Sequence, residues 1–207
     1  MRIGITVRSE NEYYFVKKRY LEYFKDFEIV LLYPYNITYM CAQCDGFVVI
    51  GGSDANPILY GEENYASVNI DDEIDGLDMK IIDYAVKNNK PIYGICRGLQ
   101  MLNIYFEGTL KQHVISHKNE PHNIILVERF LDFPHLEKVN SYHHQSVKKN
   151  GKDIQVLYYS IDGEVECFIH KKFPIIAVQF HPEMEINSEF SRLLLLYFSN
   201  LINIYKS

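Results

Sequence analysis

Short apolar runs alternate with amphipathic stretches through the first half of the chain. Short apolar runs are typical of buried strands, and apolar residues at about every third or fourth position are typical of helices. The predicted strands cover residues 3–7, 29–33, 47–50 and 91–95, and the predicted helices cover 12–27, 77–86 and 99–106. This alternation predicts a mainly parallel sheet covered by helices.

The second half is richer in strands. Its predicted strands cover residues 123–127, 154–159, 165–169 and 175–180, and a closing helix covers 188–203, with Ser188 or Asn187 as its N-cap. We therefore expect one α/β domain over residues 1–207, with a mainly parallel central sheet, flanking helices and a small antiparallel extension. Ligands of such sheets bind beyond the carboxyl ends of the strands, which places Arg8, Gly51-Gly52, Cys96 and His181 along one edge.

The composition narrows the class of partner. Of the 207 residues, 47% are apolar and 23% are charged, as in ordinary globular proteins. The formal net charge of −6 disfavours nucleic acid or an anionic membrane as the main partner. Four cysteines are too few for a disulfide scaffold of this size, and the N-terminus lacks the pattern of a signal peptide. We expect free thiols and a cytoplasmic location.

The segment Gly94-Ile95-Cys96-Arg97-Gly98 follows an apolar strand and begins an apolar helix. This is the spacing of a nucleophile elbow, with Cys in place of Ser, and its glycines permit a sharp strand-to-helix turn. The helix N-terminus favours a thiolate, and the N–H of Arg97 can point at a developing oxyanion. The alternative is a buried structural cysteine, which glycines on both sides disfavour.

His181-Pro182-Glu183 ends the last predicted strand. Positions 181 and 183 of an extended segment project to the same side, so His181 can accept the thiol proton while Glu183 orients its ring. The alternative is a surface turn, which the cysteine elbow at the same sheet edge disfavours. Gly51-Gly52 follows another strand, and the N–H of Gly52 is the candidate second oxyanion donor.

Together, the Gly-x-Cys-x-Gly-x-Gln segment ending at Gln100, the later His-Pro-Glu and the earlier Gly-Gly turn resemble a class I glutamine amidotransferase domain over nearly the whole chain. Segments 51–54, 60–62 and 140–145 are similar to the γ-glutamyl-γ-aminobutyrate hydrolase branch, whose members are free-standing hydrolases of γ-glutamyl amides. The resemblance implies a flavodoxin-like fold, a Cys-His-Glu triad, a thioester intermediate, and no metal or other cofactor.

The resemblance also implies roles by position. Cys96 would be the nucleophile, His181 the base and then the acid, and Glu183 the orienting carboxylate. Gly52 and Arg97 would supply the oxyanion N–H groups. The implied substrate-binding residues are Gly51, Gln100, Tyr142, His143 and His144, of which Gln100 would hold the glutamyl α-carboxylate and residues 142–144 would line the α-amino and α-carboxylate end.

The leaving group is the least determined feature. Among short relatives, the chain resembles the γ-glutamyl-CDP-amidate hydrolases of bacterial capsule phosphoramidate synthesis, which implies CDP-L-glutamine as substrate and cytidine diphosphoramidate as product. A diphosphate would need cations at the pocket mouth, for which Arg8, Arg97 and Lys118 are candidates. The alternatives are γ-glutamyl-γ-aminobutyrate or a γ-glutamyl polyamine. The segment beginning Glu107-Gly108 departs from the Gly-Gly usual in that branch.

Two rival functions remain open. A glutaminase subunit that supplies ammonia to a synthase partner would carry the same triad, and a non-catalytic relative would usually lack one member. We expect a small-molecule γ-glutamyl substrate, no nucleic-acid or membrane partner, and a synthase partner only under the rival hypothesis, while homo-oligomerisation stays open.

Other cysteines and histidines favour packing over metal binding. Cys41 and Cys44 form one C-x-x-C pair without a second pair to complete a zinc site. His113, His117 and His122 form a loose cluster along the chain, for which metal ligation is the minor alternative. His143 and His144 are adjacent, so on an extended segment their side chains point to opposite faces.

Overall fold

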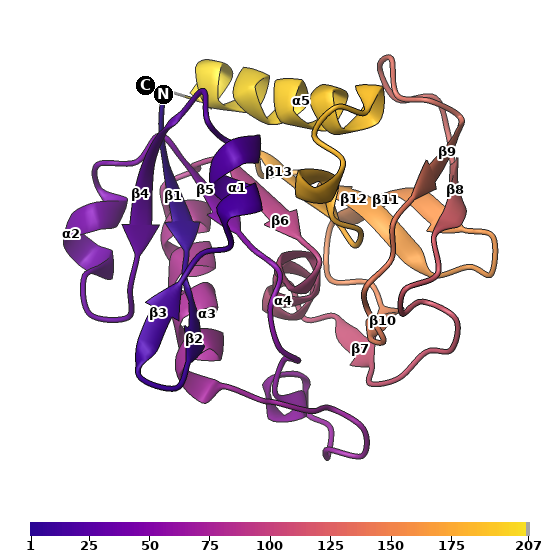
Figure 1. Ribbon diagram of the computed structural model, residues 1–207, viewed down its shortest axis with the longest axis horizontal. Helices are drawn as coiled ribbons and strands as arrows, with labels where there is room; N and C mark the ends of the chain where they lie inside the picture. Colours follow the sequence, from indigo (N-terminus) through magenta and orange to yellow (C-terminus); the bar gives the residue numbers. More distant parts are fainter. Residues whose placement is uncertain (206–207) are drawn as a thin grey trace.

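One mixed sheet organises the structure, a computed structural model that describes residues 1–205. Its strands are β1 (Arg2–Thr6), β4 (Glu28–Leu32), β5 (Gly46–Val49), β6 (Ile92–Ile95), β8 (His122–Leu126), β9 (Leu136–Val139), β11 (Ile154–Ser160), β12 (Val165–His170) and β13 (Ile175–Val178). Within residues 1–205 the nine strands pair in the order β4-β1-β5-β6-β13-β12-β11-β8-β9 (Figure 1).

The two halves of the sheet differ in strand direction. Strands β4, β1, β5, β6 and β13 pair in parallel, whereas β12, β11, β8 and β9 continue the sheet with antiparallel pairing. The predicted α/β fold with an antiparallel extension is therefore confirmed. Strand β13 joins the halves, because it pairs in parallel with β6 and antiparallel with β12.

Helices cover both faces of the parallel strands. They are α1 (Lys18–Tyr23), α2 (Ile37–Cys41), α3 (Asp72–Lys87), α4 (Arg97–Tyr105) and α5 (Glu189–Tyr205). Successive residues of β5 alternate between two apolar clusters. Val48 belongs to the cluster that contains residues of α1 and α5, while Phe47 and Val49 belong to the cluster built with α2, α3 and α4. Figure 1 shows α1 and α5 together along one side of the sheet.

The predicted helix over residues 12–27 is wrong in its first half. There β2 (Arg8–Glu10) and β3 (Tyr13–Phe15) form an antiparallel hairpin, and the helix is limited to α1. Asn11 turns the chain with a φ of 54°, a left-handed conformation that Asn tolerates better than most residues. Tyr14 then packs edge-on against Tyr33, with ring centroids 5.7 Å apart, so the aromatic side chains serve a hairpin rather than a helix face.

Smaller elements complete the chain. They are β7 (Thr109–Lys111), which pairs with β10 (Ser146–Lys149), and the 3-10 turns η1 (Pro57–Tyr60) and η2 (Pro182–Met184). Ser188 accepts a hydrogen bond from the backbone N–H of Ser191 at 3.0 Å, the geometry of an N-cap for α5. In the part of the chain that is described, no helix combines the length and apolar character needed to cross a bilayer.

Candidate active site

Cys96 lies at the sharp turn between β6 and α4. Its φ of 54° and ψ of −104° are strained for a residue with a side chain, and such strain is concentrated at functional sites. The flanking glycines are required by close packing. A Cβ atom at Gly98 would overlap the carbonyl oxygen of Val49, and one at Gly94 would lie 2.9 Å from the backbone of Gly98. The turn therefore presents a thiol at the N-terminus of α4, where the helix dipole favours negative charge.

His181 follows β13 and lies next to Cys96. Its Nδ1 is 2.6 Å from Oε1 of Glu183, and the Glu183 side chain is buried in η2. Burial lowers the pKa of His181, but the negative charge of the Cys96 thiolate, a hydrogen bond to that sulfur and the Glu183 carboxylate together raise the pKa to about 10. The imidazole is thus held between a sulfur and a carboxylate, and it can carry a proton at neutral pH.

Asn140 holds the backbone of His181 in place. Its Oδ1 accepts from the His181 N–H at 3.0 Å, and its Nδ2 donates to the His181 carbonyl oxygen at 2.9 Å. A single amide side chain thereby satisfies both backbone groups at the point where β13 ends. In the sequence, Asn140 stands out only as the first residue of the 140–145 segment. Nothing in the local pattern indicates its contact with the distant His181 backbone.

The Gly51-Gly52 turn faces Cys96 on the other side. A Cβ atom at Gly51 would lie 2.9 Å from Cε1 of His181, and one at Gly52 would lie 2.6 Å from Nε of Arg8. Arg8 donates to the carbonyl oxygen of Gly51 at 2.8 Å and also to that of Ile50. The turn is therefore packed between the imidazole and a buried guanidinium, and both positions require glycine.

Two arginines and two aspartates form a buried ion-pair network beneath the turn. Asp78 accepts from Arg8 at 3.1 Å through each carboxylate oxygen and also accepts from Arg97, which pairs with Asp75 as well. Burial lowers the pKa of both guanidinium groups and raises that of Asp75, while the opposite charges act against these shifts. Arg8 and Arg97 are thus engaged inside the protein, which disfavours the predicted contacts with a diphosphate.

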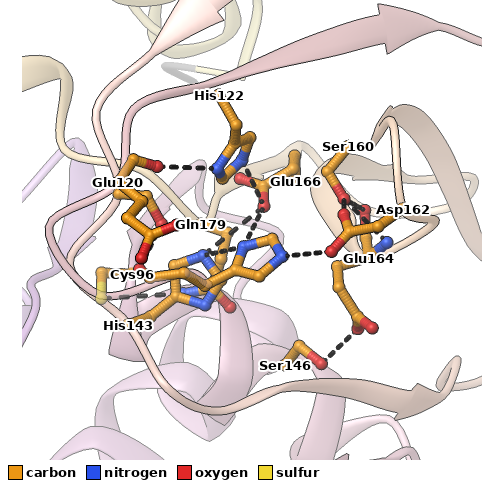
Figure 2. Close-up of polar contacts among 12 residues, drawn as sticks. Cys96, Glu120, His122, His143, Ser146, Ser160, Asp162, Glu164, Glu166 and Gln179 are labelled. Carbon is orange, nitrogen blue, oxygen red and sulfur yellow. Dashed lines mark hydrogen bonds and ion pairs between the residues drawn. The ribbon is translucent and has the colours of Figure 1, made fainter. Parts of the chain in front are cut away.

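Gln100 lies beneath the cysteine. Its Nε2 donates to the backbone carbonyl of Gln145 and to Oε1 of Gln179, both at 3.2 Å. Gln179 in turn donates from Nε2 to the sulfur of Cys96 at 3.6 Å, a contact drawn in Figure 2. The structure therefore places Gln100 in a chain of amides that ends at the thiol, not among the residues lining the cleft.

The three residues predicted to line the glutamyl end of the substrate have side chains that lie in different parts of the structure. Tyr142 is half-exposed and packs edge-on against the ring of His181, with centroids 5.9 Å apart. His143 is buried and faces Glu166, with Nε2 and Oε1 3.5 Å apart. His144 points elsewhere, with its Nε2 2.9 Å from a carboxylate oxygen of Asp54. Of these three, Tyr142 lines the cleft at the cysteine.

A cleft of about 1240 Å³ opens at the carboxyl edge of the parallel strands. Cys96, His181, Glu183 and the Gly51-Gly52 turn all line it. Two further groups of lining residues have opposite charges: Lys17 and Arg19 are basic, and Glu10, Asp71 and Asp72 are acidic. Within residues 1–205, Lys17 and Arg19 form no ion pair or side-chain hydrogen bond, so both can contact a ligand.

Comparison with known proteins gives a consistent family. The peptidase C26 family model matches residues 4–183. The glutamine amidotransferase-like protein YvdE of Lactococcus lactis is 34% identical, over 86% of this chain and 85% of that protein. The γ-glutamyl-CDP-amidate hydrolase of Campylobacter jejuni is 26% identical, over 89% of this chain and 91% of that protein.

A solved structure supports the fold. A chain from Thermoplasma acidophilum, described as a candidate GMP synthase subunit, superposes with a TM-score of 0.78 at 20% identity, covering 100% of this chain and 96% of that chain. The family match spans most of the sequence, and the Lactococcus relative matches over most of both chains. The chain therefore belongs to the peptidase C26 family of class I glutamine amidotransferase-like proteins, which are cysteine-dependent amide hydrolases.

Proposed function

We propose that this protein hydrolyses a γ-glutamyl amide through a thioester on Cys96, releasing L-glutamate and an amine or a phosphoramidate. The observation that carries the proposal is the grouping of a strained cysteine with the His181–Glu183 pair at one cleft. A carboxylate that orients an imidazole beside a thiol is the arrangement that activates a nucleophile for acyl transfer. We further propose that residues 1–207 act as one domain.

The first half-reaction forms the thioester. The Cys96 thiolate attacks the γ-carbonyl carbon, and the carbonyl oxygen takes up the negative charge. The N–H groups of Gly52 and Arg97 are the proposed donors to this oxyanion. Arg97 is the first residue of α4, so its N–H has no carbonyl partner within the helix. Protonated His181 then gives its proton to the leaving nitrogen as the C–N bond breaks, and Glu183 keeps the ring in position.

The second half-reaction releases glutamate. Water enters beside His181, which is now neutral and takes one proton from it. The resulting hydroxide attacks the thioester carbon, the C–S bond breaks, and L-glutamate leaves with the regenerated thiolate on Cys96. The same donors stabilise the oxyanion of both steps, and removing one such donor typically costs about 10²–10³-fold in kcat.

The glutamyl end has two proposed direct contacts at the cleft. Tyr142 and Gly51 line the cleft beside His181, so both can contact the glutamyl group. Gln100, His143 and His144 were predicted to bind the same end but lie outside the cleft lining. We propose that Gln100 acts through Gln179, whose amide donates to the Cys96 sulfur.

The leading candidate substrate is γ-L-glutamyl-CDP-amidate. The hydrolase name of the Campylobacter relative supports it, as do Lys17 and Arg19 at the cleft, cations that suit a diphosphate. The alternative is an amine leaving group, from γ-glutamyl-γ-aminobutyrate or a γ-glutamyl polyamine. Glu10, Asp71 and Asp72 line the same cleft and would favour a cationic amine.

A substrate panel tests the proposal. Purified protein is incubated with γ-glutamyl-CDP-amidate, γ-glutamyl-γ-aminobutyrate, a γ-glutamyl polyamine and glutamine, and products are identified by mass spectrometry. We expect glutamate release from the nucleotide and a glutamyl adduct on Cys96 in quenched samples. Cys96→Ala should be folded and inactive, while Cys41→Ala, whose thiol is buried in α2, should stay active.

Two outcomes would overturn the proposal. Glutamate release by folded Cys96→Ala would exclude the thioester. Turnover of glutamine alone, and only after a synthase is added, would establish the rival ammonia-supplying subunit instead.

A further inference from the structure

Four side chains converge at the antiparallel end of the sheet, outside the cleft. His122 lies in β8, Glu166 lies in β12, and His117 and His143 lie in the segments before β8 and β10. We call them the histidine–glutamate cluster. His117, His143 and Glu166 are at most 4% exposed, and the His122 side chain is 18% exposed. In Figure 2 the side chains of His122 and His143 both point toward the Glu166 carboxylate.

The nitrogen and oxygen atoms that face the centre of the cluster, here called its inner atoms, are spaced like the ligands of a metal ion. Oε1 of Glu166 lies 3.1 Å from Nε2 of His122, 3.5 Å from Nε2 of His143 and 3.6 Å from Nδ1 of His117. Nδ1 of His117 and Nε2 of His143 are 3.3 Å apart. A tetrahedral zinc site with bonds of about 2.0–2.1 Å has ligand-to-ligand edges of about 3.3–3.4 Å. The four measured distances fall around that value. The ligand atoms of His117, His122 and Glu166 all lie within 4.8 Å of one another, whereas His143 stands outside this group of three.

Each histidine ring also has an outer nitrogen, which faces away from the centre of the cluster. The partner of that outer nitrogen decides whether it donates or accepts a hydrogen bond. Nε2 of His117 lies 2.9 Å from a carboxylate oxygen of Asp162. Nδ1 of His143 lies 2.9 Å from the carbonyl oxygen of Gln145, and Nδ1 of His122 lies 3.3 Å from that of Glu120. These partners are acceptors, so each outer nitrogen donates a hydrogen. When such a ring is neutral, its inner nitrogen presents a lone pair to the centre of the cluster.

With all three rings neutral and protonated at their outer nitrogens, the centre of the cluster holds no hydrogen-bond donor. Imidazole lone pairs then face a carboxylate oxygen. Within residues 1–205, both Glu166 oxygens and Nε2 of His122 are buried without a hydrogen bond of acceptable geometry. Buried polar atoms without partners are costly and call for a specific explanation. A cation bound between His117, His122 and Glu166 would satisfy these unpartnered atoms, and the outer acceptors are of the kind that orient metal-bound histidines in known sites.

We propose that the histidine–glutamate cluster binds one zinc ion through His117, His122 and Glu166. Imidazole and carboxylate ligands suit zinc. The ion would tie β8 and the segment before it to β12. The N–H of His143 donates to the carbonyl oxygen of His117 at 3.1 Å, which joins the segment before β10 to this site. That segment carries Asn140 and Tyr142, which contact His181, so the ion would support one wall of the active site.

Metal content measures the proposal directly. The protein is produced without a polyhistidine tag, dialysed, and analysed by inductively coupled plasma mass spectrometry. We expect about one zinc per chain. His122→Ala and Glu166→Gln should lose the metal, whereas His135→Ala, an exposed histidine outside the cluster, should keep it. Cys96→Ala should also keep it, which separates the cluster from metal captured by the reactive thiol.

Reconstitution of the wild-type protein decides the matter if the ligand variants fail to fold. Zinc is removed with a chelator, and Co²⁺ is added while the visible spectrum is recorded. A four-coordinate site gives intense cobalt absorption, and added zinc should abolish it and raise the Tm of the chelated protein. Folded protein that binds neither metal stoichiometrically, or zinc retained by folded His122→Ala and Glu166→Gln, would overturn the proposal. These readouts do not use turnover, so they stand apart from the test of hydrolysis.

Discussion

Arg8 holds the Gly51 carbonyl through its Nε at 2.8 Å and so fixes the peptide that carries the proposed oxyanion donor. In a trans peptide the carbonyl oxygen and the following N–H point in opposite directions. With the Gly51 oxygen turned toward Arg8, the N–H of Gly52 is turned away from it. We therefore propose Arg8 as a positioning residue for the reaction, since its buried guanidinium contacts backbone carbonyls and Asp78.

Arg8→Lys tests this relationship. A lysine keeps the charge but cannot hold two carbonyls and Asp78 with one planar fork. We expect kcat to fall, by up to about 10²–10³-fold if the Gly52 donor is lost, with a smaller change in KM. Steady-state kinetics measures the effect, and Arg2→Lys, in the ion pair with Glu28 at 2.5 Å, is the control. A folded Arg8→Lys variant with the kcat of wild type would contradict the role.

Asp78→Asn should strongly destabilise the fold. Asp78 is fully buried and accepts from both Arg8 and Arg97, so the substitution leaves buried positive charge without compensation. Breaking a buried ion pair in this way costs about 3–5 kcal/mol. Urea unfolding followed by circular dichroism measures the change in the free energy of unfolding. Asp83→Asn, at the exposed pair with Lys87, should cost less than about 1 kcal/mol. Equal losses in the two variants would show that the network adds no stability.

The ionisation of His181 should make stability depend on pH. Its folded pKa, raised to about 10, lies above the ordinary histidine value near 6.5. The folded state therefore binds the proton more tightly, so this contribution is complete below about pH 6.5 and is lost as the pH rises toward 10. We expect the difference in unfolding free energy between wild type and His181→Gln to shrink from about pH 6 to about pH 10. Urea titrations under reducing conditions measure it, and a difference that grows with pH would refute the assignment.

Lys17 and Arg19 should discriminate between leaving groups. If the substrate carries a diphosphate, Lys17→Gln and Arg19→Gln should each raise KM for γ-glutamyl-CDP-amidate about tenfold, because a charge-assisted contact is lost. KM for a γ-glutamyl amine should change little. Lys18→Gln is the matched control, since Lys18 lies between them, outside the cleft lining, and pairs with Glu22. Equal effects on both substrates would argue against a diphosphate at this position.

Local sequence pattern predicted the parallel strands, the long helices and the turn at Cys96 well. It failed at residues 12–15, because aromatic residues pack equally well on a helix or a hairpin and the turn at Asn11 was not recognised. The sequence also suggested Arg8 and Arg97 as candidate ligands of a diphosphate. The carboxylates that engage them, Asp75 and Asp78, lie on a helix whose packing against the elbow cannot be inferred from spacing along the chain.

The amino-acid sequence alone determined which segments become strands and which turns need glycine, because side-chain periodicity and backbone sterics act over a few neighbouring residues. Tertiary structure decided which side chains, distant from one another in the sequence, come into contact. Asn140 meets His181, and His117, His122 and His143 meet Glu166, because antiparallel pairing of β8, β11 and β12 brings their segments together. Polar contacts of this kind depend on strand order and register, which a linear pattern of hydrophobic and polar residues does not encode.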